Sequence, residues 1–170
     1  MKRPISGLII LVVVVAGIVP IANAARSGAA QVSPSGTTHG VIGGDFDTQL
    51  PAGSVNGADW GVTATLPHAA AARLTDNVVF VSVDRWKDGG DQTKPTTTDT
   101  NPKCTGTVQN PTAPKGIVCI YVLGGDNAAN VSGYSVVPGA GGSKYGFKLK
   151  WDSVENGDSF IDAVWAYQYP

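Results

Sequence analysis

Seven short apolar or alternating runs recur along the chain, and clusters of Gly, Pro, Asn and Asp separate them. Runs of this kind, punctuated by turn residues, are typical of the strands of a β-sandwich or barrel. We therefore predict an all-β domain over residues 40–170. The runs begin at Val41, Trp60, Asn77, Gly116, Gly133, Tyr145 and Phe160.

The runs predict two kinds of strand, one with a single solvated face and one covered on both faces. Residues 145–151 alternate, so that Tyr145 and Phe147 lie on one face while Lys148 and Lys150 lie on the other, which predicts a strand with one solvated side. Residues 78–83 and 116–123 are apolar on both faces, which predicts central strands covered on both sides. The large aromatic residues expected in the core are Trp60, Phe80, Trp151 and Trp165.

The first 24 residues have the layout of a secretory signal peptide. Two basic residues precede an apolar run over residues 8–22, and a small-residue pattern ends at Ala24, where we expect cleavage. The alternative is a retained membrane anchor, but Pro20 and Asn23 leave the run short of the roughly 20 apolar residues that span a bilayer. Residues 25–39 are small and polar and predict a flexible lead-in to the domain.

The mature chain is weakly acidic. The full chain has a net charge of −1, and removal of Lys2 and Arg3 with the leader makes the remainder more negative. This balance gives no electrostatic reason to expect a nucleic acid or an anionic membrane as partner.

The two cysteines, Cys104 and Cys119, are compatible with a disulfide, a metal site or a reactive thiol. Export places them in an oxidising compartment, which favours a disulfide. A zinc site would need about four ligands, and His39 and His68 lie far away without metal-type spacing. Because Cys119 lies within the run 116–123, the disulfide is expected to tie a core strand to the loop before it.

The long polar segment 84–103 holds the candidate metal ligands. Asp84, Asp88 and Asp91 lie in the run DRWKDGGD, and carboxylates in glycine turns are typical Ca²⁺ ligands. The spacing fits neither an EF-hand nor a calcium-binding β-solenoid repeat. The alternative interpretation is that Gly-Asp pairs simply form turns, as they do in most β-proteins. No other cofactor is indicated.

Three aromatic residues outside the expected core, Trp86, Tyr167 and Tyr169, are candidates for ligand binding. An exposed aromatic platform suits sugar rings or a protein contact. The alternative is that they are isolated surface aromatics without a role.

The sequence gives little indication of a catalytic site. The chain has no Gly-x-Ser-x-Gly elbow, and neither histidine has a local partner suggestive of a catalytic triad. Paired carboxylates for glycoside hydrolysis stay open, because any two of the 13 acidic residues could meet in space. We predict a protein that is not an enzyme.

Four stretches carry a resemblance to a known group of proteins: LPHAAAARLTDNVVFVSV, CTGTVQNPTAPKGIVCIYV, YGFKLKW and GDSFIDAVWAYQY. They resemble the C-terminal β-domain of secreted, uncharacterised actinobacterial proteins, often displayed on collagen-like or other repetitive stalks. The resemblance implies an extracellular, antiparallel β-sandwich similar to the jelly-roll heads of complement C1q-like proteins, and with it a homotrimer. It brings no catalytic residues. This chain departs from the stalked pattern because no Gly-x-y repeat precedes residue 40.

The sequence as a whole predicts a secreted, non-enzymatic β-sandwich domain for cell-surface interaction or assembly, with a protein or a glycan as its partner. The alternative prediction is a carbohydrate-binding module that uses the exposed aromatics and the 84–103 loop.

Overall fold

The computed structural model describes residues 31–32, 36–49, 58–83, 95–137 and 141–170, which form eight strands and one 3-10 turn. The strands are β1 (Gln31–Val32), β2 (Thr37–Thr48), β3 (Asp59–Thr65), β4 (Val79–Ser82), β5 (Val118–Asp126), β6 (Ala129–Ser135), β7 (Gly146–Asp152) and β8 (Gly157–Gln168), and the turn η1 (Asp76–Val78) precedes β4. The predicted all-β class is confirmed, and each of the seven runs contributes one strand. β2 begins at Thr37, shortly before the predicted start of the domain at residue 40, and β1 lies within the predicted lead-in.

The predicted leader, residues 1–24, lies outside the described residues. Among the residues that are described, no helix has the length and apolar character needed to cross a bilayer.

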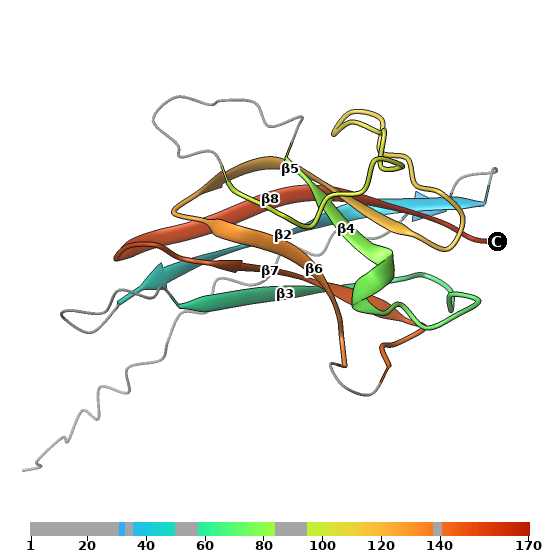
Figure 1. The fold of residues 1–170 in the computed structure, drawn as a ribbon, viewed down its shortest axis with the longest axis horizontal. Helices are drawn as coiled ribbons and strands as arrows, with labels where there is room; N and C mark the ends of the chain where they lie inside the picture. The colour runs from blue at the N-terminus through green and yellow to red at the C-terminus, as the bar shows by residue number, and fades with distance from the viewer. Residues whose placement is uncertain (1–30, 33–35, 50–57, 84–94, 138–140) are drawn as a thin grey trace, which may run out of the picture.

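The strands form two layers (Figure 1). One sheet has five strands in the order β1-β2-β8-β5-β4, and the other has three in the order β3-β7-β6. β2 pairs with β8 along its whole length, from Thr37 opposite Gln168 to Thr48 opposite Gly157. β3 pairs with β7 in the same antiparallel sense. Strands from the two ends of the domain therefore lie side by side in both sheets.

The five-stranded sheet is mixed, which corrects the expectation of an antiparallel fold. β4 and β5 run parallel, from Val79 opposite Val118 to Ser82 opposite Tyr121. Parallel neighbours need a crossover of about a dozen residues or more, and the long connection between β4 and β5 provides one. β4 was expected to be central, but it is the edge strand of its sheet.

The edge position of β4 is covered by its own crossover. Val81 N donates to the carbonyl oxygen of Asp99 at 2.9 Å, and Val131 N of β6 donates to the carbonyl oxygen of Thr96 at 2.8 Å. The segment 96–99 thus joins β4 of one sheet to β6 of the other. This cover explains why an edge strand has an apolar sequence on both faces.

The core lies between the two sheets. Trp151 and Trp165 are fully buried, as predicted, and the ring of Phe147 meets Trp165 edge-on at 5.2 Å. Trp60 and Phe80 were expected in the core but are only half-buried. Trp60 lies at the margin of the core.

A buried asparagine joins the ends of four strands. Asn127, in the β5–β6 turn, has a left-handed backbone with φ 47°. Its Oδ1 accepts from the backbone amides of Val154 (2.8 Å) and Glu155 (2.9 Å), which lie between β7 and β8. Its carbonyl oxygen accepts from Ser159 Oγ, which in turn accepts from Trp151 Nε1 at 3.0 Å. Two connections are therefore locked together at one end of the core.

Candidate functional site

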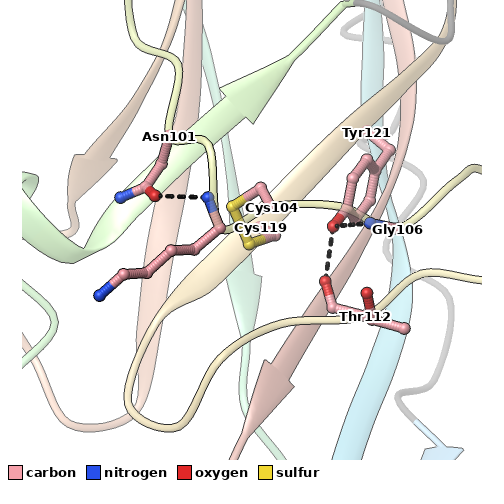
Figure 2. The surroundings of a disulfide bond; sticks show 7 residues. Asn101, Cys104, Gly106, Thr112, Cys119 and Tyr121 are labelled. Carbon is pink, nitrogen blue, oxygen red and sulfur yellow. Dashed lines mark hydrogen bonds between the residues drawn. A yellow bond between two sulfur atoms is a disulfide. The ribbon is translucent and has the colours of Figure 1, made fainter.

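The predicted disulfide between Cys104 and Cys119 is present, with Cα atoms 5.6 Å apart. Figure 2 shows a second anchor beside it, Tyr121. The phenol oxygen of Tyr121 accepts from Gly106 N at 2.9 Å and donates to the carbonyl oxygen of Thr112 at 2.6 Å. The loop 104–117, which we call the bracket, is therefore held to β5 by a covalent bond and by a buried tyrosine.

The bracket covers part of the outer face of the five-stranded sheet. Cys119, Tyr121 and Ala166 lie on that face and are fully buried. The close approach requires glycine at position 106, because a Cβ there would lie 2.5 Å from Thr112 N. The cover explains why the run 116–123 is apolar on both faces.

Beyond the bracket the same face is open and apolar. A hollow of about 310 Å³ lies between β2 and β5, across β8. We call it the apolar hollow, and Val41 and Leu123 on its walls are 44% and 45% exposed. The register of β5 shifts between Val122 and Gly124, so Leu123 is the extra residue of a bulge. The residues that line the apolar hollow are Val41, Ile42, Gly43, Leu123, Asp162, Ala163 and Val164.

A second concave surface, which we call the polar groove, lies on the outer face of the three-stranded sheet and encloses about 540 Å³. Residues from η1, from the crossover before the bracket, and from β6 and β7 form it. The residues that line it are Asp76, Thr98, Asp99, Asn130, Ser132, Gly133, Tyr134, Lys150 and Asp152.

Backbone amides of β6 hold two carboxylates at one side of the polar groove. Asp99 Oδ2 accepts from Gly133 N at 2.7 Å, and Asp76 Oδ1 accepts from Ser135 N at 2.7 Å. Burial raises the pKa of the Asp99 carboxyl above its usual range, the Gly133 amide opposes this, and the charge of Asp76 adds to the rise.

The other side of the polar groove carries an amide, a carboxylate, an ammonium group and an aromatic ring. Asn130 Nδ2 donates to Asp152 Oδ2 at 2.8 Å, so an amide and a carboxylate meet across β6 and β7. Lys150 Nζ lies 4.8 Å from the centroid of the Tyr134 ring, in a cation–π contact. Hydrogen-bond donors, acceptors and an aromatic ring therefore face the same space.

The candidate metal ligands Asp84, Asp88 and Asp91, and the candidate aromatic Trp86, lie outside the described residues. In the part of the chain that the structure does describe, no group of three or more His, Cys, Asp or Glu is arranged to hold a metal ion.

The predicted aromatic platform at the end of β8 needs correction. Tyr167 is 1% exposed, because it shares the inward face of β8 with Trp165. Tyr169 is half-buried, donates from its hydroxyl to the carbonyl oxygen of His68 at 2.9 Å, and meets the Tyr167 ring edge-on at 4.9 Å. These two tyrosines pack against the protein and do not form an exposed surface for a ligand.

Sequence reasoning missed most of the polar groove. Two of its residues, Thr98 and Asp99, do belong to the 84–103 loop, to which only the alternative prediction of a carbohydrate-binding module assigned ligand binding. Tyr134 and Lys150 lie on the solvated faces of their strands, and the alternation in residues 145–151 indicated such a face without showing what stands beside it.

No protein-family model, no curated protein and no solved structure matches this chain. The apolar hollow and the polar groove are therefore the features from which we infer function.

Proposed function

We propose that the protein is an exported, non-enzymatic β-sandwich domain that acts through protein contact at the cell surface, with the apolar hollow as its contact face. The observation that carries the proposal is the exposure of Val41 and Leu123 on opposite walls of one hollow. Exposed apolar side chains around a concavity are typical of protein contact sites, where an apolar anchor of the partner fills the pocket.

The disulfide supports an extracellular location. Disulfides persist in oxidising compartments, and this one holds the bracket that closes the rest of the same sheet face. The leader predicted over residues 1–24 agrees with export.

We further propose a jelly-roll topology and assembly into a homotrimer, as in C1q-like heads. The nested pairing of β2 with β8 and of β3 with β7 supports this topology, whereas the parallel pairing of β4 with β5 departs from an all-antiparallel jelly roll. In a closed trimer each apolar hollow meets a different surface of the next copy, so three equivalent contacts form and no hollow is left open.

Light scattering behind a sizing column tests the assembly, with the mature chain of residues 25–170. We expect a trimer for the wild type and a monomer for Leu123→Asp, because the substitution replaces an apolar wall of the hollow with a second carboxylate near that of Asp162. Val154→Asp is the matched control, since Val154 is 60% exposed but lies outside the apolar hollow, and it should stay trimeric. A wild type that is monomeric at all concentrations, or a trimeric Leu123→Asp, would refute assembly through this face.

The absence of catalysis is tested separately with a panel of glycosides and esters. We expect no turnover. Turnover that is lost when a single acidic residue or serine is changed would contradict the non-enzymatic proposal.

A further inference from the structure

The polar groove has the size of a small-molecule site. Its volume of about 540 Å³ falls within the range of about 300–1,000 Å³ that is usual for ligand pockets. It lies on the three-stranded sheet, on the far side of the core from the apolar hollow, so the two surfaces are independent of each other.

Asn130 and Asp152 offer donors and acceptors at the same point. Their hydrogen bond of 2.8 Å uses one donor of the amide and one carboxylate oxygen. An amide has a second N–H and a carbonyl oxygen, and a carboxylate has about four lone-pair sites, so further hydrogen-bonding capacity remains. A hydroxyl group both donates and accepts, which makes neighbouring hydroxyls the natural complement of such a pair.

The carboxylates of Asp76 and Asp99 are fixed before any ligand arrives. Each is held by a backbone amide of β6 at 2.7 Å, so neither side chain must be ordered on binding. Lys150 over the ring of Tyr134 likewise restrains the orientation of that ring.

The charges of the polar groove disfavour one class of ligand. Three carboxylates, of Asp76, Asp99 and Asp152, face one ammonium group, that of Lys150. An anionic ligand would be repelled, whereas a ligand rich in hydroxyl donors finds acceptors. We propose that the polar groove binds an uncharged saccharide, with Asp99 and Asp152 accepting from its hydroxyl groups and Tyr134 packing against a ring.

The test is a calorimetric titration of the exported protein with four soluble hexasaccharides. Three are uncharged, built from glucose, mannose and N-acetylglucosamine, and the fourth is built from galacturonate. We expect at least one uncharged hexasaccharide to bind, and galacturonate to bind at least about tenfold more weakly than that one. If no uncharged hexasaccharide binds at millimolar concentration, or if galacturonate binds most tightly, the proposal is wrong.

Variants then place the ligand. Asp152→Asn and Tyr134→Ala should each weaken binding by about tenfold or more, because they remove a charged acceptor and a packing surface. Asp158→Asn is the matched control, an exposed aspartate of β8 outside the groove, and it should bind like the wild type. Ser132→Trp fills the groove without removing any of the proposed contact residues and should also abolish binding. Equal affinities for all these variants would overturn the proposal, and thermal unfolding checks that each is folded.

Discussion

Tyr121 and the disulfide hold the same bracket, so their contributions to stability should depend on each other. Tyr121→Phe removes the acceptor of the buried Gly106 amide and the donor to Thr112. A buried amide without a partner costs about 1–3 kcal/mol. The Thr112 carbonyl adds little, because Thr112 is exposed and water replaces the lost donor. We therefore expect Tyr121→Phe to lower the free energy of unfolding by about 1–3 kcal/mol.

Cys104→Ala opens a loop with a sequence separation of 15 residues. The chain-entropy estimate for a loop of this length is about 3 kcal/mol. Once the disulfide is gone the bracket detaches more readily, and Gly106 N reaches water whether or not the phenol is present. The double variant should therefore lose less stability than the sum of the two single losses, by about 1 kcal/mol.

Urea unfolding of the wild type, both single variants and the double variant measures this coupling. Equal m-values would show that the unfolded states are comparable. Tyr134→Phe is the control, a half-exposed tyrosine whose loss of a hydroxyl should change stability by less than about 0.5 kcal/mol. Additivity of the two losses within about 0.5 kcal/mol would refute the idea that both anchors act on one loop.

Three further predictions concern stability. Asn127→Ala should lower the free energy of unfolding, measured in urea, by about 2–4 kcal/mol, because several hydrogen bonds are lost. Asn127→Gly should lower it by about 1 kcal/mol less, because glycine tolerates φ 47°. Equal losses for the two variants would contradict the argument from the backbone conformation. Gly133→Ala should lower the free energy of unfolding by about 1–3 kcal/mol, since its Cβ would lie 2.7 Å from the Val79 carbonyl oxygen. Gly61→Ala is the control: its Cβ would lie 3.4 Å from the nearest atom, so thermal unfolding should show almost no change. Because the pKa of the Asp99 carboxyl is raised in the folded state, its ionisation destabilises the fold as the pH rises from 3.8, the usual pKa of an aspartate, through the folded pKa. Asp99→Asn should thus be more favourable relative to the wild type at pH 7 than at pH 3, and a gain that is larger at pH 3 would reverse the sign we assign.

The strands were predictable because their apolar runs are short and well separated. The disulfide was predictable because only two cysteines are present and the leader indicates export. The burial of Tyr167 was also encoded: Trp165 was expected in the core, and period two along β8 places Tyr167 on the same face. The error came from treating residues near the end of the strand as exposed without applying that period.

The parallel pairing of β4 with β5 and the polar groove could not be predicted in the same way. Alternation assigns a side chain to a face but does not say which strand lies next to it. Asp76 and Ser135 are far apart in the sequence and meet only because β6 lies beside η1 and the crossover. A site assembled from four such segments, η1, the crossover, β6 and β7, leaves no local pattern in any one of them.

The pairing of β2 with β8 has a consequence for the order of folding. β8 follows every other strand that the structure describes, yet it lies in the middle of the five-stranded sheet, between β2 and β5. During synthesis β2 therefore emerges long before its partner β8, and the central position of the five-stranded sheet stays empty until β8 has been made. Such non-local pairing favours slow folding, on the order of milliseconds to seconds. A chain that stays unpaired for so long would still be unfolded on reaching an export machinery, so this pairing suits the export that we propose.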